Sequence, residues 1–115
     1  MDLINTIQQK QHELDVSIKK LRETGTAYAQ AEKDYKICLR TEALKLRSEK
    51  GMAVTLINQI VFGIPEVAEL RFKRDVAKTI YDANQDAIQS IKLQMRILDS
   101  QINREYGNPR VGVGS

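Results

Sequence analysis

Apolar residues recur at three- and four-residue steps along the first part of the chain, which is the spacing of one face of a helix. The pattern predicts a long helical arm over about residues 3–49. The apolar positions of this arm are Ile4, Ile7, Leu14, Ile18, Leu21, Tyr28, Ala31, Tyr35, Leu39, Ala43 and Leu46.

Two glycines bear on where this arm bends and ends. Gly25 lies between Thr24 and Thr26, and a glycine inside a helix costs about 1 kcal/mol relative to alanine. Either the helix is kinked or broken there, or it continues and tolerates the glycine. Gly51 follows Ser48-Glu49-Lys50 and predicts the end of the arm, since glycine readily takes the left-handed conformation that closes a helix.

A second helical arm is predicted over about residues 65–106. Pro65 and Glu66 suit the first turn of a helix. The apolar positions from Leu70 onwards keep heptad spacing over about four heptads, after one gap at Arg74. The seam residues that we expect to hold subunits together are Tyr81, Asn84, Ile88, Ile91, Met95, Leu98 and Ile102.

The apolar face of the second arm is wider than a two-stranded seam needs. Two helices alone have almost no interior, so the pattern predicts a dimer or a higher oligomer. Asn84 at a seam position would fix register and oligomeric state, unless it faces the rim. The second apolar line beside the seam consists of Val76, Ile80, Ala83, Ala87 and Ile97.

The segment between the arms, residues 51–64, carries no charge. A strand here would have no pairing partner, so we expect a short helix with Thr55 as its N-cap and Gly63 as its stop. The fold class is therefore all-α: a long antiparallel helical hairpin, one domain over residues 1–106, followed by a flexible tail over 107–115. The apolar surface expected at the bend is Leu56, Ile57, Ile60, Val61 and Phe62.

The composition offers little chemistry. The 115 residues include one histidine, His12, and one cysteine, Cys38, so we expect no zinc site, no other metal and no cofactor. No phosphate-binding loop or nucleophile motif is present, and we expect no enzymatic activity. No stretch predicts a membrane span or a secretory signal, and the single cysteine suits a reducing cytoplasm.

Positive charge is concentrated around the bend. Residues 33–78 hold ten basic and six acidic residues, whereas the chain as a whole has a net charge of +3. Such a patch could bind nucleic acid or an acidic protein, or it could be a solvated face with salt bridges. The basic residues that share one side of each arm near the bend are Lys33, Lys36, Arg40, Arg47, Arg71, Arg74 and Lys78.

Several segments between about residues 27 and 106 resemble small helical-hairpin, coiled-coil proteins that phages and prophages of Gram-positive bacteria encode in their replication and recombination regions. The resemblance implies a helical hairpin in the cytoplasm of a bacterial host, and it carries over no catalytic residue. The segments are Ala31-Glu32-Lys33-Asp34-Tyr35-Lys36, Leu39-Arg40, Leu44-Lys45-Leu46-Arg47, Val54-Thr55-Leu56-Ile57, Glu66-Val67-Ala68-Glu69-Leu70-Arg71, Lys73-Arg74-Asp75-Val76-Ala77 and Ile97-Leu98-Asp99-Ser100-Gln101-Ile102-Asn103-Arg104-Glu105-Tyr106.

Three functions fit these expectations. The first is a non-enzymatic accessory factor in phage DNA replication or recombination, which contacts nucleic acid or a DNA-metabolism protein through the basic residues. The second is an inhibitor of a host defence protein that binds through the apolar bend. The third is a structural coiled-coil component of the virion.

Overall fold

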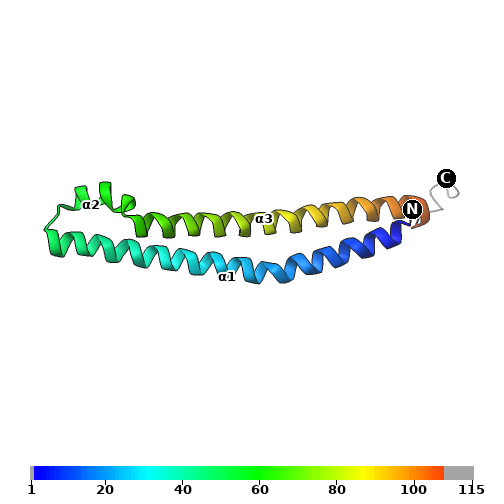
Figure 1. Cartoon of the computed structure of the whole chain (residues 1–115). Helices are drawn as coiled ribbons and strands as arrows, with labels where there is room; N and C mark the ends of the chain where they lie inside the picture. Colours follow the sequence, from blue (N-terminus) through cyan, green and yellow to red (C-terminus); the bar gives the residue numbers. More distant parts are fainter. Residues whose placement is uncertain (1, 108–115) are drawn as a thin grey trace. The chain divides into compact units, whose positions relative to one another are not determined.

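The computed structural model describes residues 2–107, and every regular element in that range is helical. The all-α class is confirmed. The elements are α1 (Leu3–Lys50), α2 (Val54–Ile60), the 3-10 turn η1 (Val61–Gly63), α3 (Pro65–Ile102) and a π-helical turn, η2 (Asn103–Gly107) (Figure 1).

The chain divides into two compact units, which are described separately. One combines Met1–Arg22 with Ala83–Ser115, and the other is Glu23–Asp82. Residues 108–115 of the predicted tail lie outside the described range. No described helix has an apolar stretch long enough to cross a bilayer.

The ends of α1 follow local hydrogen-bonding rules. The carboxylate of Asp2 accepts a hydrogen bond from the backbone N–H of Ile4 at 2.9 Å, which caps the first turn. At the other end Gly51 has a φ of 61°, and its N–H bonds the carbonyl of Arg47 at 3.1 Å. This left-handed closure confirms the predicted end of the arm.

The helix α1 continues without interruption through Gly25, so a break at this residue is not observed. The glycine has a packing reason instead. A Cβ at position 25 would lie 3.1 Å from Cε1 of Tyr81, which is closer than ordinary carbon contacts. The ring of Tyr81 also stacks on Tyr28 with the ring centroids 5.9 Å apart. Because Gly25 has no side chain, the rings of Tyr28 and Tyr81 have room to stack beside it.

Within the unit Glu23–Asp82, α1 and α3 run antiparallel. Tyr81 contacts Gly25 and Tyr28, whereas Arg74 contacts Glu32 and Tyr35, so advancing along one helix means going back along the other. The shielded side chains keep steps of three and four residues on both helices. Arg74 occupies the position that looked like a gap in the apolar pattern. The seam consists of Thr24, Tyr28, Ala31, Tyr35, Cys38 and Glu42 from α1 and Val67, Leu70, Arg74, Ala77 and Tyr81 from α3.

The same spacing orders the unit that contains both ends of the described chain. Of its described residues, Leu3, Leu14 and Ile88 are buried. Asn84 lies in the seam and its side-chain amide donates to the carbonyl of Ser17 at 3.0 Å. The seven residues predicted to join subunits are each buried or half-buried within the single chain: Tyr81, Asn84, Ile88, Ile91, Met95, Leu98 and Ile102.

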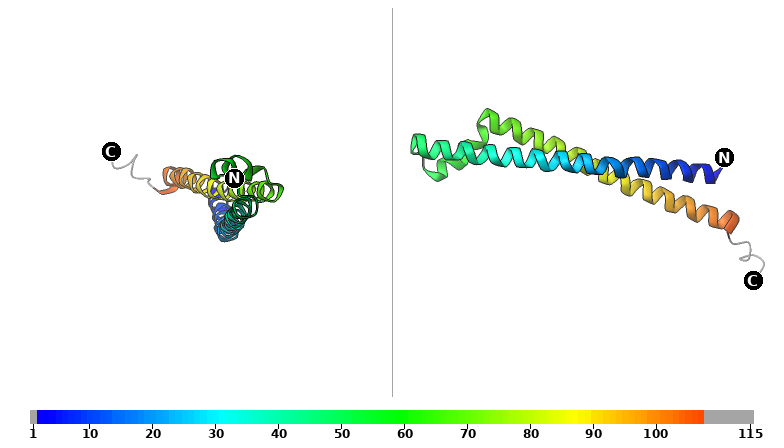
Figure 2. Two further views of the ribbon diagram at one scale, coloured as in Figure 1. Left: turned by 90° about the vertical axis from the view of Figure 1, so that its left-hand side faces the viewer. Right: turned by 90° about the horizontal axis from the view of Figure 1, so that it is seen from below.

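The segment between the long helices contains α2 and η1 (Figure 2). The residue before α2 is Ala53, which makes no side-chain capping bond, so the prediction of Thr55 as N-cap is wrong. The cap is the last extended residue before the helix, and that residue is Ala53. The helix begins at Val54, so Thr55 lies inside its first turn. Gly63 ends η1 as expected of a stop, but without a left-handed backbone.

Candidate binding groove beside the bend

A groove of about 680 Å³ lies between the last turns of α1 and the α2–η1 segment. All of its walls belong to the unit Glu23–Asp82. α2 and η1 form one wall because Ile57 and Val61 turn inward and are only 5% and 3% exposed. The groove is lined by Lys36, Ile37, Leu39, Arg40, Ala43, Leu44, Arg47, Val54, Ile57, Asn58, Val61 and Phe62.

The floor and walls of the groove are apolar and in part open to solvent. Ile37 and Leu44 on α1 are 56% and 61% exposed, and Phe62 on η1 is 42% exposed. These side chains face the groove from both walls. Large apolar side chains that stay exposed in one concave surface are typical of a binding site.

The predicted apolar surface of the bend is divided by the structure. Ile57, Val61 and Phe62 line the groove. Leu56 and Ile60 do not, and they are 45% and 39% exposed elsewhere on the bend. The division follows helical geometry, since residues three and four apart share a face of α2 and their neighbours point away from it.

The charged residues that line the groove are all basic: Lys36, Arg40 and Arg47. No carboxylate is among the described lining residues. The groove therefore joins two sets of residues that the sequence suggested separately, the cations of the first arm and the apolar residues of the bend. Sequence spacing could place each set on one helix face, but not the two faces against each other.

The three cations of the groove differ in how free they are. Lys36 is 70% exposed and lies 3.7 Å from Glu32. Arg47 donates from Nη1 to the carbonyl oxygen of Met52 at 3.0 Å, which ties the end of α1 to the following loop. Arg40 is exposed and makes no ion pair among the described residues. Arg40 is thus the cation most available to an anionic group.

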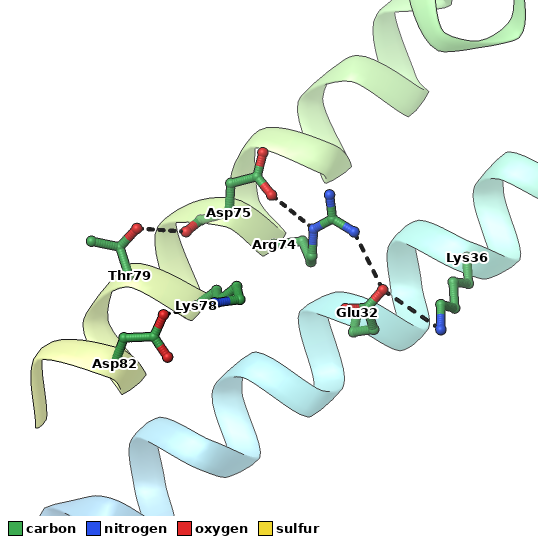
Figure 3. A network of polar contacts seen from close by, with 7 residues as sticks. All are labelled: Glu32, Lys36, Arg74, Asp75, Lys78, Thr79 and Asp82. Carbon is green, nitrogen blue, oxygen red and sulfur yellow. Dashed lines mark hydrogen bonds and ion pairs between the residues drawn. The ribbon is translucent and has the colours of Figure 1, made fainter. Parts of the chain in front are cut away.

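The predicted cations of the second arm lie outside the groove, and two of them are engaged within the chain (Figure 3). Arg74 joins Glu32 at 3.3 Å to Asp75 at 2.8 Å, and its side chain is only 21% exposed. Lys78 pairs with Asp82 at 2.7 Å. Arg71 is exposed and lies over the ring of Phe62 at 5.4 Å. Lys33, on α1, is exposed and does not line the groove.

The pKa values of the two engaged cations follow from these contacts. Burial lowers the pKa of Arg74, but hydrogen bonds and charges from Asp75 and Glu32 outweigh burial and raise it. The hydrogen bond and the charge of Asp82 raise the pKa of Lys78. Both side chains stay cationic, and their charge is partly neutralised by the neighbouring carboxylates.

One cluster of metal-ligand side chains is formed that the sequence did not suggest. The thiol of Cys38 and the carboxylates of Glu42 and Glu66 lie within 4.8 Å of one another. Cys38 and Glu42 are one turn apart on α1, whereas Glu66 comes from the first turn of α3. Burial, and then the charges of both carboxylates, raise the pKa of the thiol, so a metal here would have to displace its proton.

No protein family, curated protein or solved structure matches this chain. The phage-family resemblance therefore stays a prediction. The groove, the engaged cations and the thiol cluster are the observations from which a function can be argued.

Proposed function

We propose that this chain is a non-enzymatic binding protein whose groove holds a short, acidic and apolar segment of a protein partner. The observation that carries the proposal is the pairing of an apolar floor with a rim of Lys36, Arg40 and Arg47 and no lining carboxylate. An amphipathic helix that lays its apolar side chains in such a groove is a common mode of peptide recognition. Acidic residues on the helix would meet the cationic rim.

The size of the groove agrees with this occupant. On α1 the lining residues run from Lys36 to Arg47. At 1.5 Å per residue this corresponds to roughly 16 Å, or about three turns of a bound helix. Apolar anchors at i, i+3 or i+4, and i+7 cover about 10 Å at that rise, so they would fit within the groove.

Nucleic acid fits the groove less well. Proteins that bind single strands use several aromatic rings as stacking surfaces. Phe62 is the one aromatic side chain among the described lining residues, and Arg71 already lies over its ring. Of the seven cations predicted to bind nucleic acid or a protein partner, Lys36, Arg74 and Lys78 are paired with carboxylates inside the chain.

The wider setting is also part of the proposal. We propose that the two long helices form one antiparallel hairpin along their whole length, as the antiparallel contacts inside the unit Glu23–Asp82 support. The sequence resemblance to phage-encoded proteins supports a partner in phage DNA metabolism. A host defence protein is the alternative partner, and the apolar groove would serve it in the same way.

The experiment is a fluorescence-polarisation titration with two labelled probes. One probe is a synthetic amphipathic helix of about four turns with leucine anchors and a glutamate-rich polar face. The other is a single-stranded oligonucleotide. We expect the peptide to bind, and Arg40→Glu or Leu44→Glu to weaken it by at least about tenfold, which corresponds to about 1.4 kcal/mol.

Lys33→Glu is the matched control, because Lys33 is an exposed cation of the same helix outside the groove. It should leave peptide binding almost unchanged. The opposite result would be a chain that binds the oligonucleotide but not the peptide, with Lys33→Glu and Arg40→Glu weakening that binding equally. It would show a general basic surface and overturn the proposal. A peptide affinity that Leu44→Glu leaves unaltered would overturn it too.

A further inference from the structure

A second apolar groove, of about 400 Å³, lies on another face of the unit Glu23–Asp82. It is formed by one turn of α1 and by α3. Phe72, Val76 and Ile80 of α3 are 63%, 41% and 54% exposed, although they follow one another at steps of four residues on one side of the helix. Among the described residues, the groove is lined by Glu23, Thr24, Ala27, Phe72, Lys73, Val76, Ala77 and Ile80.

This surface lies beside the seam between α1 and α3 and shares only Thr24 and Ala77 with the seam residues named above. The seam uses Tyr81, Arg74 and Val67, which are buried or half-buried. Val76 and Ile80 belong to the second apolar line of the sequence, and the chain's own helices leave them open. An apolar line of this kind beside a filled seam requires another partner surface.

The charges at the two ends of the groove indicate what that partner is. Its charged lining residues are one acid, Glu23, and one base, Lys73. Gly25 lies opposite Tyr81, and Glu32 lies opposite Arg74, at the same heights along the two antiparallel helices. By this register Glu23 is ten residues from the height of Lys73. Glu23 and Lys73 therefore lie roughly 15 Å apart along the helix axes, at 1.5 Å per residue. That separation is too large for a salt bridge within one chain.

A groove with opposite charges at opposite ends is complementary to itself under a two-fold rotation. In an isologous interface each surface patch meets the same patch of the other subunit. With the axis midway along the groove, Glu23 of one copy meets Lys73 of the second copy, and the reverse pair forms at the other end. Val76 and Ile80 lie on either side of the axis, so Val76 of one copy then faces Ile80 of the other.

We infer that the occupant of this groove is a second copy of this chain, bound antiparallel about a two-fold axis through the Phe72–Ile80 face. The interface differs from the one expected from the sequence, which placed the subunit contacts at Tyr81 through Ile102. It is also independent of the groove at the bend. Each chain of such a dimer would keep its groove beside the bend open to a partner.

Charge exchange between two variants tests the inference directly. Glu23→Lys and Lys73→Glu each place like charges opposite one another at both ends of the interface. Each variant alone should self-associate about tenfold more weakly than the natural chain, measured by sedimentation equilibrium. An equimolar mixture of the two should associate as strongly as the natural chain, since both cross-subunit pairs are then of opposite charge.

Three further variants control the experiment. Ile80→Glu should abolish association while circular dichroism keeps its helical signal, because Ile80 lies outside the seam. Two charge reversals should leave association unchanged. They are Asp86→Lys, at an exposed site elsewhere on α3, and Arg40→Glu, in the groove beside the bend. A natural chain that sediments as a monomer at every concentration would overturn the inference. A mixture that associates no better than the single variants would do so as well.

Discussion

The guanidinium carbon of Arg74 lies 4.6 Å from the centre of the Tyr35 ring. Tyr35 is only 6% exposed, and the same guanidinium reaches Glu32 across the two helices. A planar cation thus fills a seam position that the sequence pattern left as a gap. Arginine suits this place because its flat face stacks on a ring while its edge donates hydrogen bonds.

Replacing this arginine by lysine should destabilise the chain although the charge is kept. Arg74→Lys loses the stacked plane and the paired donors, and we expect the free energy of unfolding in urea to fall by about 1 kcal/mol. Arg71→Lys is the matched control, since Arg71 also lies over a ring, that of Phe62, but is exposed. The control should change stability by less than about 0.5 kcal/mol. Equal losses in the two variants would contradict this role of Arg74.

The contact between Gly25 and Tyr81 predicts an unusual response to alanine. In an open helix Gly→Ala stabilises by about 1 kcal/mol. Because the new Cβ would lie 3.1 Å from the Tyr81 ring, Gly25→Ala should change stability by less than about 0.5 kcal/mol. In a Tyr81→Leu background the same change should recover most of its usual gain. Thermal unfolding of the four proteins measures both values, and a full gain in the natural background would argue against the packing role.

Gly51 and Gly63 should respond to alanine with opposite signs. A Cβ meets nothing within 4 Å at either position. Gly51 has a φ of 61°, so Gly51→Ala should cost about 1 kcal/mol through backbone strain alone. Gly63 does not have a positive φ, and Gly63→Ala should stabilise by about 0.4 to 1 kcal/mol by restricting the unfolded chain. Losses of similar size at both positions would contradict the backbone argument.

The Cys38 cluster predicts a thiol that alkylates slowly. Burial and the carboxylates of Glu42 and Glu66 raise its pKa, whereas Lys45 lowers it. At pH 8 the thiol is mostly protonated, and only the thiolate reacts with iodoacetamide. Glu42→Gln or Glu66→Gln should lower the pKa and speed the reaction about two- to fivefold, and Lys45→Gln should slow it. Rates that move in the same direction for Glu66→Gln and Lys45→Gln would refute this assignment of charges.

The sequence predicted the elements well because helix signals are local. Pro65 with Glu66, the left-handed glycine at position 51 and the spacing of the apolar residues each act within a few turns of chain. Asp2 was missed as a cap, although an aspartate just before a run of helix-forming residues is a common capping signal. Thr55 was chosen as a cap because of its residue type, whereas the cap position falls at Ala53.

The functional surface could be predicted only in part, because it depends on contacts between helices. Helical spacing grouped Arg71, Arg74 and Lys78 on one side of the second arm. It could not show that Glu32, more than forty residues away in the chain, draws Arg74 into the seam. For the same reason the meeting of Arg40 with Val61 in one groove, and of Cys38 with Glu66 in one cluster, is visible only in three dimensions.

The reversal after α1 has a consequence for chirality. Among the described residues, Gly51 alone combines an open surrounding with a positive φ. The backbone there is the mirror image of the conformation that L-amino acids favour. A D-amino acid would find it relaxed, so chemical synthesis with D-alanine at position 51 should stabilise the chain at the site where L-alanine strains it. The end of α1 thus depends on the left-handed backbone of one residue, to which the bond from Arg47 to the carbonyl of Met52 is added.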